Sequence, residues 1–131
     1  PPILDMNNIT GPFTITGAGG EIDFQPFEVA HGNAKALGFR VGDMAYLPDV
    51  SDIPDEAWAH LKNLKLWIVD ALRYDPHPSH THVEKTLDWI VRVKPERAII
   101  TNMHVDLDYA TLQSELPIGV EPAFDMLTHS I

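Results

Sequence analysis

Residues 66–101, LWIVDALRYDPHPSHTHVEKTLDWIVRVKPERAIIT, decide the fold class of this 131-residue chain. Leu66-Trp67-Ile68-Val69 and Ala98-Ile99-Ile100-Thr101 are nearly continuous apolar runs, which are typical of strands covered on both faces. Between them, Thr81 and Glu84 have the spacing of a capping box, which predicts the start of a helix. The buried stripe of that helix is expected to comprise Val83, Leu87, Ile90 and Val91.

Residues 11–50 are predicted to form antiparallel hairpins before this strand–helix–strand unit. Gly17-Ala18-Gly19-Gly20 and Gly42-Asp43 are strong hairpin signals between runs of strand-forming residues. Strands are expected at 13–16, 21–24, 26–30, 37–41 and 44–47. Helices are expected from Pro54 and over 109–115, with a last strand over 120–124. Hairpins followed by alternating helices and strands predict a single α/β domain segment.

The composition excludes several classes of protein. Nineteen acidic residues against nine Lys and Arg give a formal charge of −10, which argues against a broad electrostatic surface for DNA or RNA. No apolar run approaches the roughly 18 residues of a membrane span, so we expect no membrane-spanning segment. The chain has no cysteine, which removes disulfides and thiolate metal sites and makes the cytoplasm the default expectation.

Four polar residues follow predicted strands and are candidates for a shared site: His31, Asp49, His80 and His104. The carboxyl ends of strands in open α/β sheets lie along one edge, where such side chains converge. Imidazole and carboxylate groups are the ligands that hold Zn²⁺, Mn²⁺ or Fe without cysteine. Each also has a simpler interpretation: His31-Gly32 as a turn, Asp49 as an Asx turn, and the histidines of residues 75–82 as a solvated loop.

Several ordered motifs carry a family resemblance. They are His31-Gly32, Leu37-Gly38-Phe39-Arg40, Ala45-Tyr46-Leu47-Pro48-Asp49-Val50, Val69-Asp70-Ala71-Leu72-Arg73, His77-Pro78-Ser79-His80, and residues 98–109 and 119–125. Over residues 1–126 the chain resembles the C-terminal half of the αββα metallo-β-lactamase sandwich. It is most similar to the branch of the phosphoribosyl cyclic phosphate phosphodiesterases, close to the tRNA 3′-processing endonucleases.

The resemblance implies a role for each matching residue. His31 matches a ligand of the first of two divalent ions, Zn²⁺ or Mn²⁺, and Asp49 matches the carboxylate that bridges them. The family commonly reads Thr-His where this chain has Thr101-Asn102. His104, two residues later, is the preferred ligand because an extended segment restores the same side, and Asn102 is the weaker candidate.

The resemblance also implies groups that act on the substrate. His80 matches a histidine beside the substrate phosphate that serves as general acid. Arg73 is a weaker candidate for steadying that phosphate, with a structural ion pair as the alternative. The implied activity is a metal-dependent phosphodiesterase acting on a small phosphorylated substrate such as a nucleotide, with a homodimer as a further expectation. The alternatives are a non-catalytic α/β binding module and an acyl-ester hydrolase of the same superfamily.

The family signature His-x-His-x-Asp-His, which supplies most ligands of the first half, is absent from these 131 residues. This chain alone is therefore expected to carry an incomplete dinuclear site. The chain is interpreted as either a segment of a longer protein or a degenerate half. The half-sandwich topology favours a segment, because a lone half would leave one apolar face of its sheet uncovered.

Overall fold

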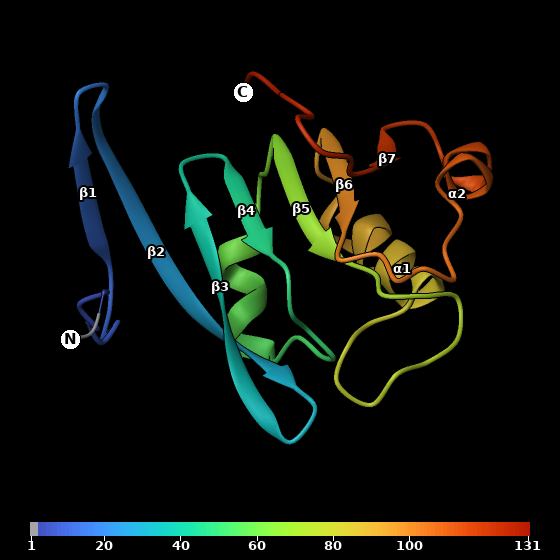
Figure 1. The fold of residues 1–131 in the computed structure, drawn as a ribbon, viewed down its shortest axis with the longest axis horizontal. Helices are drawn as coiled ribbons and strands as arrows, with labels where there is room; N and C mark the ends of the chain where they lie inside the picture. Colours follow the sequence, from blue (N-terminus) through green and yellow to red (C-terminus); the bar gives the residue numbers. More distant parts are fainter. Residues whose placement is uncertain (1–2) are drawn as a thin grey trace.

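The computed structural model describes residues 3–131, which form one seven-stranded mixed sheet in the order β1-β2-β3-β4-β5-β6-β7 (Figure 1). The strands are β1 (Phe13–Gly17), β2 (Gly20–His31), β3 (Ala34–Val41), β4 (Met44–Leu47), β5 (Leu66–Asp70), β6 (Arg97–Thr101) and β7 (Val120–Pro122). Neighbours from β1 to β4 are antiparallel, and neighbours from β4 to β7 are parallel. The helices are the 3₁₀ helix η1 (Asp55–Leu61), α1 (Val83–Val93) and α2 (Tyr109–Glu115).

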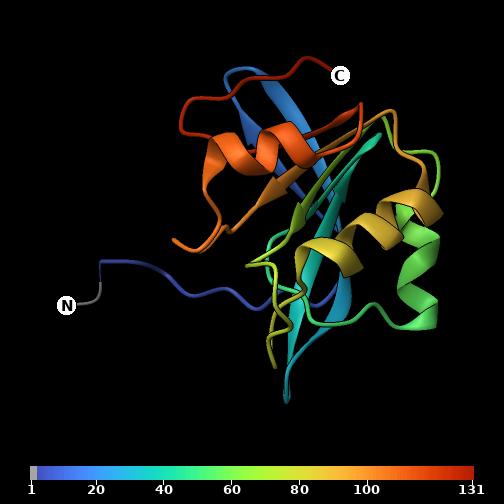
Figure 2. The ribbon, with the colours of Figure 1, turned by 90° about the vertical axis from the view of Figure 1, so that its right-hand side faces the viewer.

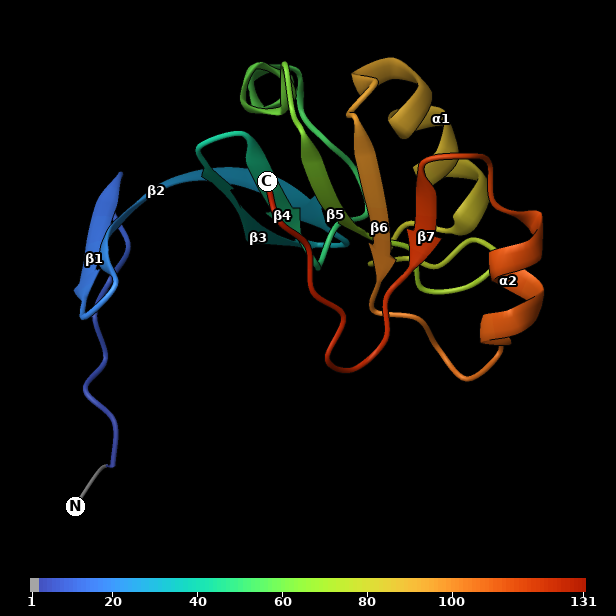
Figure 3. The same ribbon diagram turned by 90° about the horizontal axis from the view of Figure 1, so that it is seen from above.

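The main core lies between the sheet and the layer formed by η1 and α1, which cover one of its faces (Figures 2 and 3). Trp67 and Val69 of β5 are fully buried in it, and the parallel register places Val69 beside Leu47 of β4. Trp58 and Trp89 meet edge to face at 6.2 Å between η1 and α1. Burial of these large side chains from both layers is the dominant stabilising term of the fold.

The opposite face of the sheet is more open. The register aligns Tyr46, Ile68 and Ile99 in one row across β4, β5 and β6. Tyr46 is 41% exposed and Ile68 is half-buried, whereas Ile99 is buried. No helix of the described residues lies over this row, and the segment after β7 runs along this side (Figure 3). This face of the sheet therefore has no helical layer among the described residues.

Two expected strands prove to be one. The 21–24 and 26–30 runs form the single twelve-residue strand β2. Its first part pairs with β1 as far as Phe24, and its second part pairs with β3 from Gln25 onward. Pro26 lies just beyond the end of the β1 pairing, a position at which a strand tolerates proline.

The start of α1 also differs from the expected capping box. His82 is the N-cap residue and makes no side-chain cap, whereas Thr81 is buried and its Oγ1 lies 3.2 Å from Thr86 Oγ1. Of the expected buried stripe, Val83 and Ile90 are buried and Leu87 is half-buried, but Val91 is 69% exposed. Thr86, which the stripe did not include, is buried and its hydroxyl donates to the backbone carbonyl of Asp70 at 2.8 Å.

Candidate metal centre

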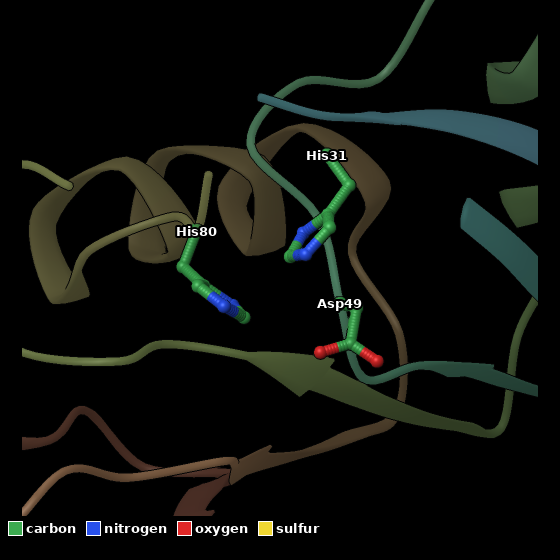
Figure 4. A group of neighbouring side chains, drawn as sticks. All are labelled: His31, Asp49 and His80. Atoms are coloured by element: carbon green, nitrogen blue, oxygen red, sulfur yellow. The ribbon is translucent and has the colours of Figure 1, made fainter. Parts of the chain in front are cut away.

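Three side chains from separate segments meet beyond the carboxyl ends of the strands (Figure 4). His31 ends β2, Asp49 follows β4, and His80 lies in the loop between β5 and α1. One ligand atom from each lies within 4.8 Å of the others. The rings of His31 and His80 meet edge to face with their centroids 4.7 Å apart. The structure thus brings together three of the four residues that the strand-end argument selects.

A close backbone contact holds His31 near this loop. Gly32 has a φ of +61°, and a Cβ there would lie 3.1 Å from Ser79 Cβ and 3.3 Å from the Pro78 carbonyl oxygen. The Gly32 N–H donates to Ser51 Oγ at 2.9 Å. Glycine is needed at this turn both for the left-handed conformation and for the space, so Gly32 lets the β2–β3 turn pack against the loop that carries His80.

The loop that presents His80 is closed at its base and braced from within. The Leu72 N–H donates to the Thr81 carbonyl at 3.1 Å, which joins the two ends of the loop. The Arg73 guanidinium donates to the carbonyl oxygens of Asp75 at 3.1 Å and Pro76 at 2.8 Å. The structure therefore places Arg73 as a brace of this loop. Its expected contact with substrate phosphate stays a prediction.

Asp70 is the residue of this site that the sequence reasoning missed. It ends β5, is fully buried, and its Oδ2 accepts from His80 Nδ1 at 2.8 Å and from the Val50 N–H at 3.2 Å. Burial raises the pKa of Asp70, and the hydrogen bonds from His80 and Val50 oppose that rise. The signal in the sequence is a lone carboxylate that directly ends a continuous apolar run.

The Asp70 contact fixes how His80 presents its ring. When Asp70 is ionised, its carboxylate can only accept, and His80 Nδ1 then carries the hydrogen that points to Asp70. Nε2 of His80 is then the nitrogen that is left for a metal ion or a substrate. A carboxylate behind an imidazole is the usual arrangement that orients histidines in metal sites.

His77 lies beside His80, with ring centroids 5.4 Å apart. Its Nδ1 accepts from the Ser79 N–H at 3.3 Å. Desolvation lowers the pKa of His77, and the nearby cationic group of Arg73 lowers it further. The third histidine of this segment, His82, lies at the N-cap position of α1.

The residues present fit a divalent metal ion. Two imidazoles and one carboxylate are ligands that Zn²⁺ and Mn²⁺ accept without cysteine. His31 Nδ1 is buried and has no hydrogen-bond partner among residues 3–131. Buried polar atoms without a partner are rare in folded proteins. A bound cation, or one of its water ligands, would give this nitrogen a partner.

The structure does not bring His104 into this group. His104 Nδ1 lies 2.9 Å from Asp106 Oδ2, and about half of the His104 side chain is exposed. Asn102 takes the position at the site instead, with its Nδ2 3.2 Å from the Pro48 carbonyl oxygen. The expectation for His104 assumed an extended segment, in which side chains two residues apart lie on the same side. Asn102 has a φ of +61°, so the segment is not extended there and this alternation stops.

Comparison with known proteins shows what this arrangement is similar to. A solved structure described as a new diphosphatase from the PhnP family aligns with a TM-score of 0.87 and 30% identity, over 95% of this chain and 47% of that chain. Zn²⁺-bound PqqB from Methylobacterium extorquens aligns with a TM-score of 0.66 and 13% identity, over 94% of this chain and 55% of that chain. The second likeness is one of fold alone.

A curated relative carries a different name. A protein of Porphyromonas gingivalis (strain ATCC BAA-308 / W83) named octanoyltransferase is 33% identical over 113 residues. The aligned region is 82% of this chain and 22% of that protein. The chain therefore spans about a fifth of the length of this relative and about half of each matching structure.

The family model described as a beta-lactamase superfamily domain matches residues 3–103, which include His31, Asp49 and His80. The seven-stranded sheet with η1 and α1 on one face confirms the predicted C-terminal half of a metallo-β-lactamase sandwich. In the described part of the chain, no helix has the length and apolar character needed to cross a bilayer. The chain belongs to the beta-lactamase superfamily and has the metallo-β-lactamase fold.

Proposed function

We propose that this chain supplies part of the active site of a metal-dependent phosphodiesterase that acts on a small phosphorylated substrate. The observation that carries the proposal is the meeting of His31, Asp49 and His80, whose ligand atoms lie within 4.8 Å of one another. The buried carboxylate of Asp70 behind His80 supports it, because a solvated loop histidine has no need of such a partner.

His31 and Asp49 are the residues proposed to hold metal in this chain. When bound, a pair of divalent ions, Zn²⁺ or Mn²⁺, activates a water molecule and stabilises charge on the phosphate oxygens. Asp49 is exposed and can offer both carboxylate oxygens, as a bridging ligand must. His31 offers an imidazole whose position is set by the Gly32 turn.

His80 is proposed as the general acid and not as a metal ligand, because a metal-bound Nε2 carries no proton to donate. Asp70 holds Nδ1 of the imidazole, so a proton on Nε2 is directed away from Asp70. Transfer of that proton to the departing alkoxide leaves a neutral ring that still donates to Asp70. A positioned acid of this kind contributes about 10²–10⁴ in rate.

A phosphate substrate fits the surroundings of His80 better than an acyl chain does. The neighbouring groups are polar, and one of them is cationic: His77, Ser79, Asn102 and the cation Arg73. The chain as a whole has a charge of −10, so binding of an anionic substrate would depend on Arg73 and on metal. The similarity to a structure described as a diphosphatase supports the same class of substrate.

Acyl-ester hydrolysis is the second candidate function. It is favoured by the 33% identity to the protein named octanoyltransferase, although the alignment covers 22% of that protein. The same metal and the same His31–Asp49 pair would serve it. An acyl substrate would need an apolar channel at His80, whereas the residues around His80 named above are polar.

The test is hydrolysis of bis(p-nitrophenyl) phosphate by the purified full-length protein with added Mn²⁺ or Zn²⁺, alongside p-nitrophenyl acetate and octanoate. We expect phosphodiester cleavage that EDTA abolishes and that His31→Ala or Asp49→Ala reduces at least 100-fold. His129→Ala is the matched control, because His129 pairs with Glu121 at the other end of the strands. Unchanged turnover in either ligand variant contradicts the mechanism, and preferential cleavage of octanoate favours the acyl alternative.

A further inference from the structure

We propose that Asn102 is a positioning residue: its side-chain amide ties the Asp70–His80 pair to the segment that carries Asp49. Asn102 Nδ2 lies 3.2 Å from the Pro48 carbonyl oxygen and 3.3 Å from Asp70 Oδ1. Both partners are acceptors, so the NH₂ group faces them and supplies one hydrogen to each. The third close atom, His80 Nδ1 at 3.3 Å, is in contact but not an acceptor, because its own hydrogen points to Asp70.

The amide joins the ends of three adjacent parallel strands. Pro48 follows β4 and directly precedes Asp49, Asp70 ends β5, and Asn102 follows β6. One rigid planar group therefore fixes the spacing between the segment of Asp49 and the carboxylate that orients His80. Displacement of either partner breaks a hydrogen bond to the same nitrogen.

The backbone of Asn102 makes this reach possible. Its φ of +61° lies in the left-handed region, where asparagine is several-fold enriched among non-glycine residues. That conformation turns the chain at the end of β6 while the side chain reaches back to β4 and β5. Asn63 has a φ of +54°, is exposed, and lies between η1 and β5, so it is a matched residue with the same backbone conformation.

Asn102 acts on a bound ion through its neighbours. The amide nitrogen that faces the site has no free lone pair, so it is a hydrogen-bond donor and not a metal ligand. Partners that orient metal ligands typically change metal affinity 10–100-fold when they are replaced. The expected loss of metal affinity rests on the proposed function, whereas the expected change in the orientation of His80 does not.

The experiment compares Asn102→Gly, Asn102→Ala and Asn63→Ala with the unchanged full-length protein. Asn102→Gly tolerates the positive φ and removes the donor without adding a charge beside Asp70, so it separates hydrogen bonding from backbone strain. In the metal-free protein, ¹⁵N-detected NMR of the imidazoles reports the tautomer of His80. Calorimetric titration with Zn²⁺ reports metal affinity.

We expect His80 to carry its hydrogen on Nδ1 in the unchanged protein and to become a mixture of tautomers in both Asn102 variants. Zn²⁺ affinity should fall about tenfold in those variants. Asn63→Ala should leave both readouts within twofold. A wild-type tautomer and wild-type Zn²⁺ affinity in Asn102→Gly overturn the proposal. If the unchanged protein neither binds Zn²⁺ nor cleaves phosphodiesters while the tautomer still shifts in Asn102→Gly, the proposed function fails and the role of Asn102 stands.

Discussion

His80 Nδ1 lies 2.8 Å from Oδ2 of Asp70, and Asp70 has no exposed surface at all. The carboxylate also receives the Val50 N–H, while its backbone carbonyl receives the Thr86 hydroxyl at 2.8 Å. Asp70 is therefore held by the segment after β4, by α1 and by the loop that carries His80. The orientation of His80 depends on packing in the interior of the domain as well as on its own loop.

The first prediction concerns the charge behind His80. Asp70→Asn keeps the volume of the side chain but removes the acceptor charge, so the imidazole loses its fixed tautomer. We expect phosphodiesterase turnover to fall about 10–100-fold. The measurement is steady-state turnover of bis(p-nitrophenyl) phosphate with circular dichroism as a folding check. Asp88→Asn, an exposed substitution on α1, is the control and should keep full turnover.

The second prediction separates backbone strain from packing at the turn after β2. Gly32 and Gly42 have φ values of +61° and +54°, but only Gly32 has atoms within 4 Å of an added Cβ. Alanine at either site costs about 1–2 kcal/mol for the left-handed conformation. We expect Gly32→Ala to lower the free energy of unfolding further than Gly42→Ala and also to weaken Zn²⁺ binding, measured by urea unfolding and calorimetry. Equal effects of the two substitutions would contradict a role for the Ser79 contact.

The third prediction concerns His104. Its Nδ1 pairs with Asp106 and it lies outside the group of His31, Asp49 and His80. We expect His104→Ala to change Zn²⁺ affinity by less than twofold, whereas His31→Ala should lose at least tenfold. Calorimetric titration of the full-length protein measures both. A tenfold loss in His104→Ala would restore His104 as the ligand that the family pattern suggests.

The fourth prediction distinguishes the two roles of Arg73. Its guanidinium donates to the carbonyls of Asp75 and Pro76. Arg73→Met keeps the apolar stem but loses both hydrogen bonds, so we expect the free energy of unfolding to fall by about 1–2 kcal/mol. Thermal unfolding measures this loss, and steady-state kinetics measures KM. A raised KM with unchanged stability would instead indicate direct contact with substrate phosphate.

Much of the fold could be predicted from local sequence because its signals are local. Nearly continuous apolar runs gave β5 and β6, and glycine-rich turns gave the hairpins of β1–β2 and β3–β4. The helix over 109–115 has the predicted bounds, since Asp108 caps it by accepting from the Thr111 N–H at 2.8 Å. Val83 and Ile90 of α1 are buried as predicted. The burial of Thr86 could not be predicted, because its partner, the Asp70 carbonyl, is brought to it only by the tertiary structure.

The site was predictable in outline and not in detail. The rule that strand ends converge correctly brought His31, Asp49 and His80 to one place. It gave no weight to Asp70, because a polar residue after an apolar run also marks an ordinary strand end. The rule also grouped His104 with these residues, which the structure does not do. The positive φ of Asn102 turns the chain before His104, and hydropathy periodicity cannot predict that turn.

The candidate ligands come from three segments that lie far apart along the chain, and each is placed by a different strand or loop. An unfolded chain would have to close two long loops before His31, Asp49 and His80 could come together. A metal ion held at this site would therefore bind the native state selectively and stabilise it by mass action, by about 2.7 kcal/mol at a hundredfold excess over the dissociation constant. A melting curve recorded with and without Zn²⁺ is then a direct gauge of whether these strand ends are correctly assembled.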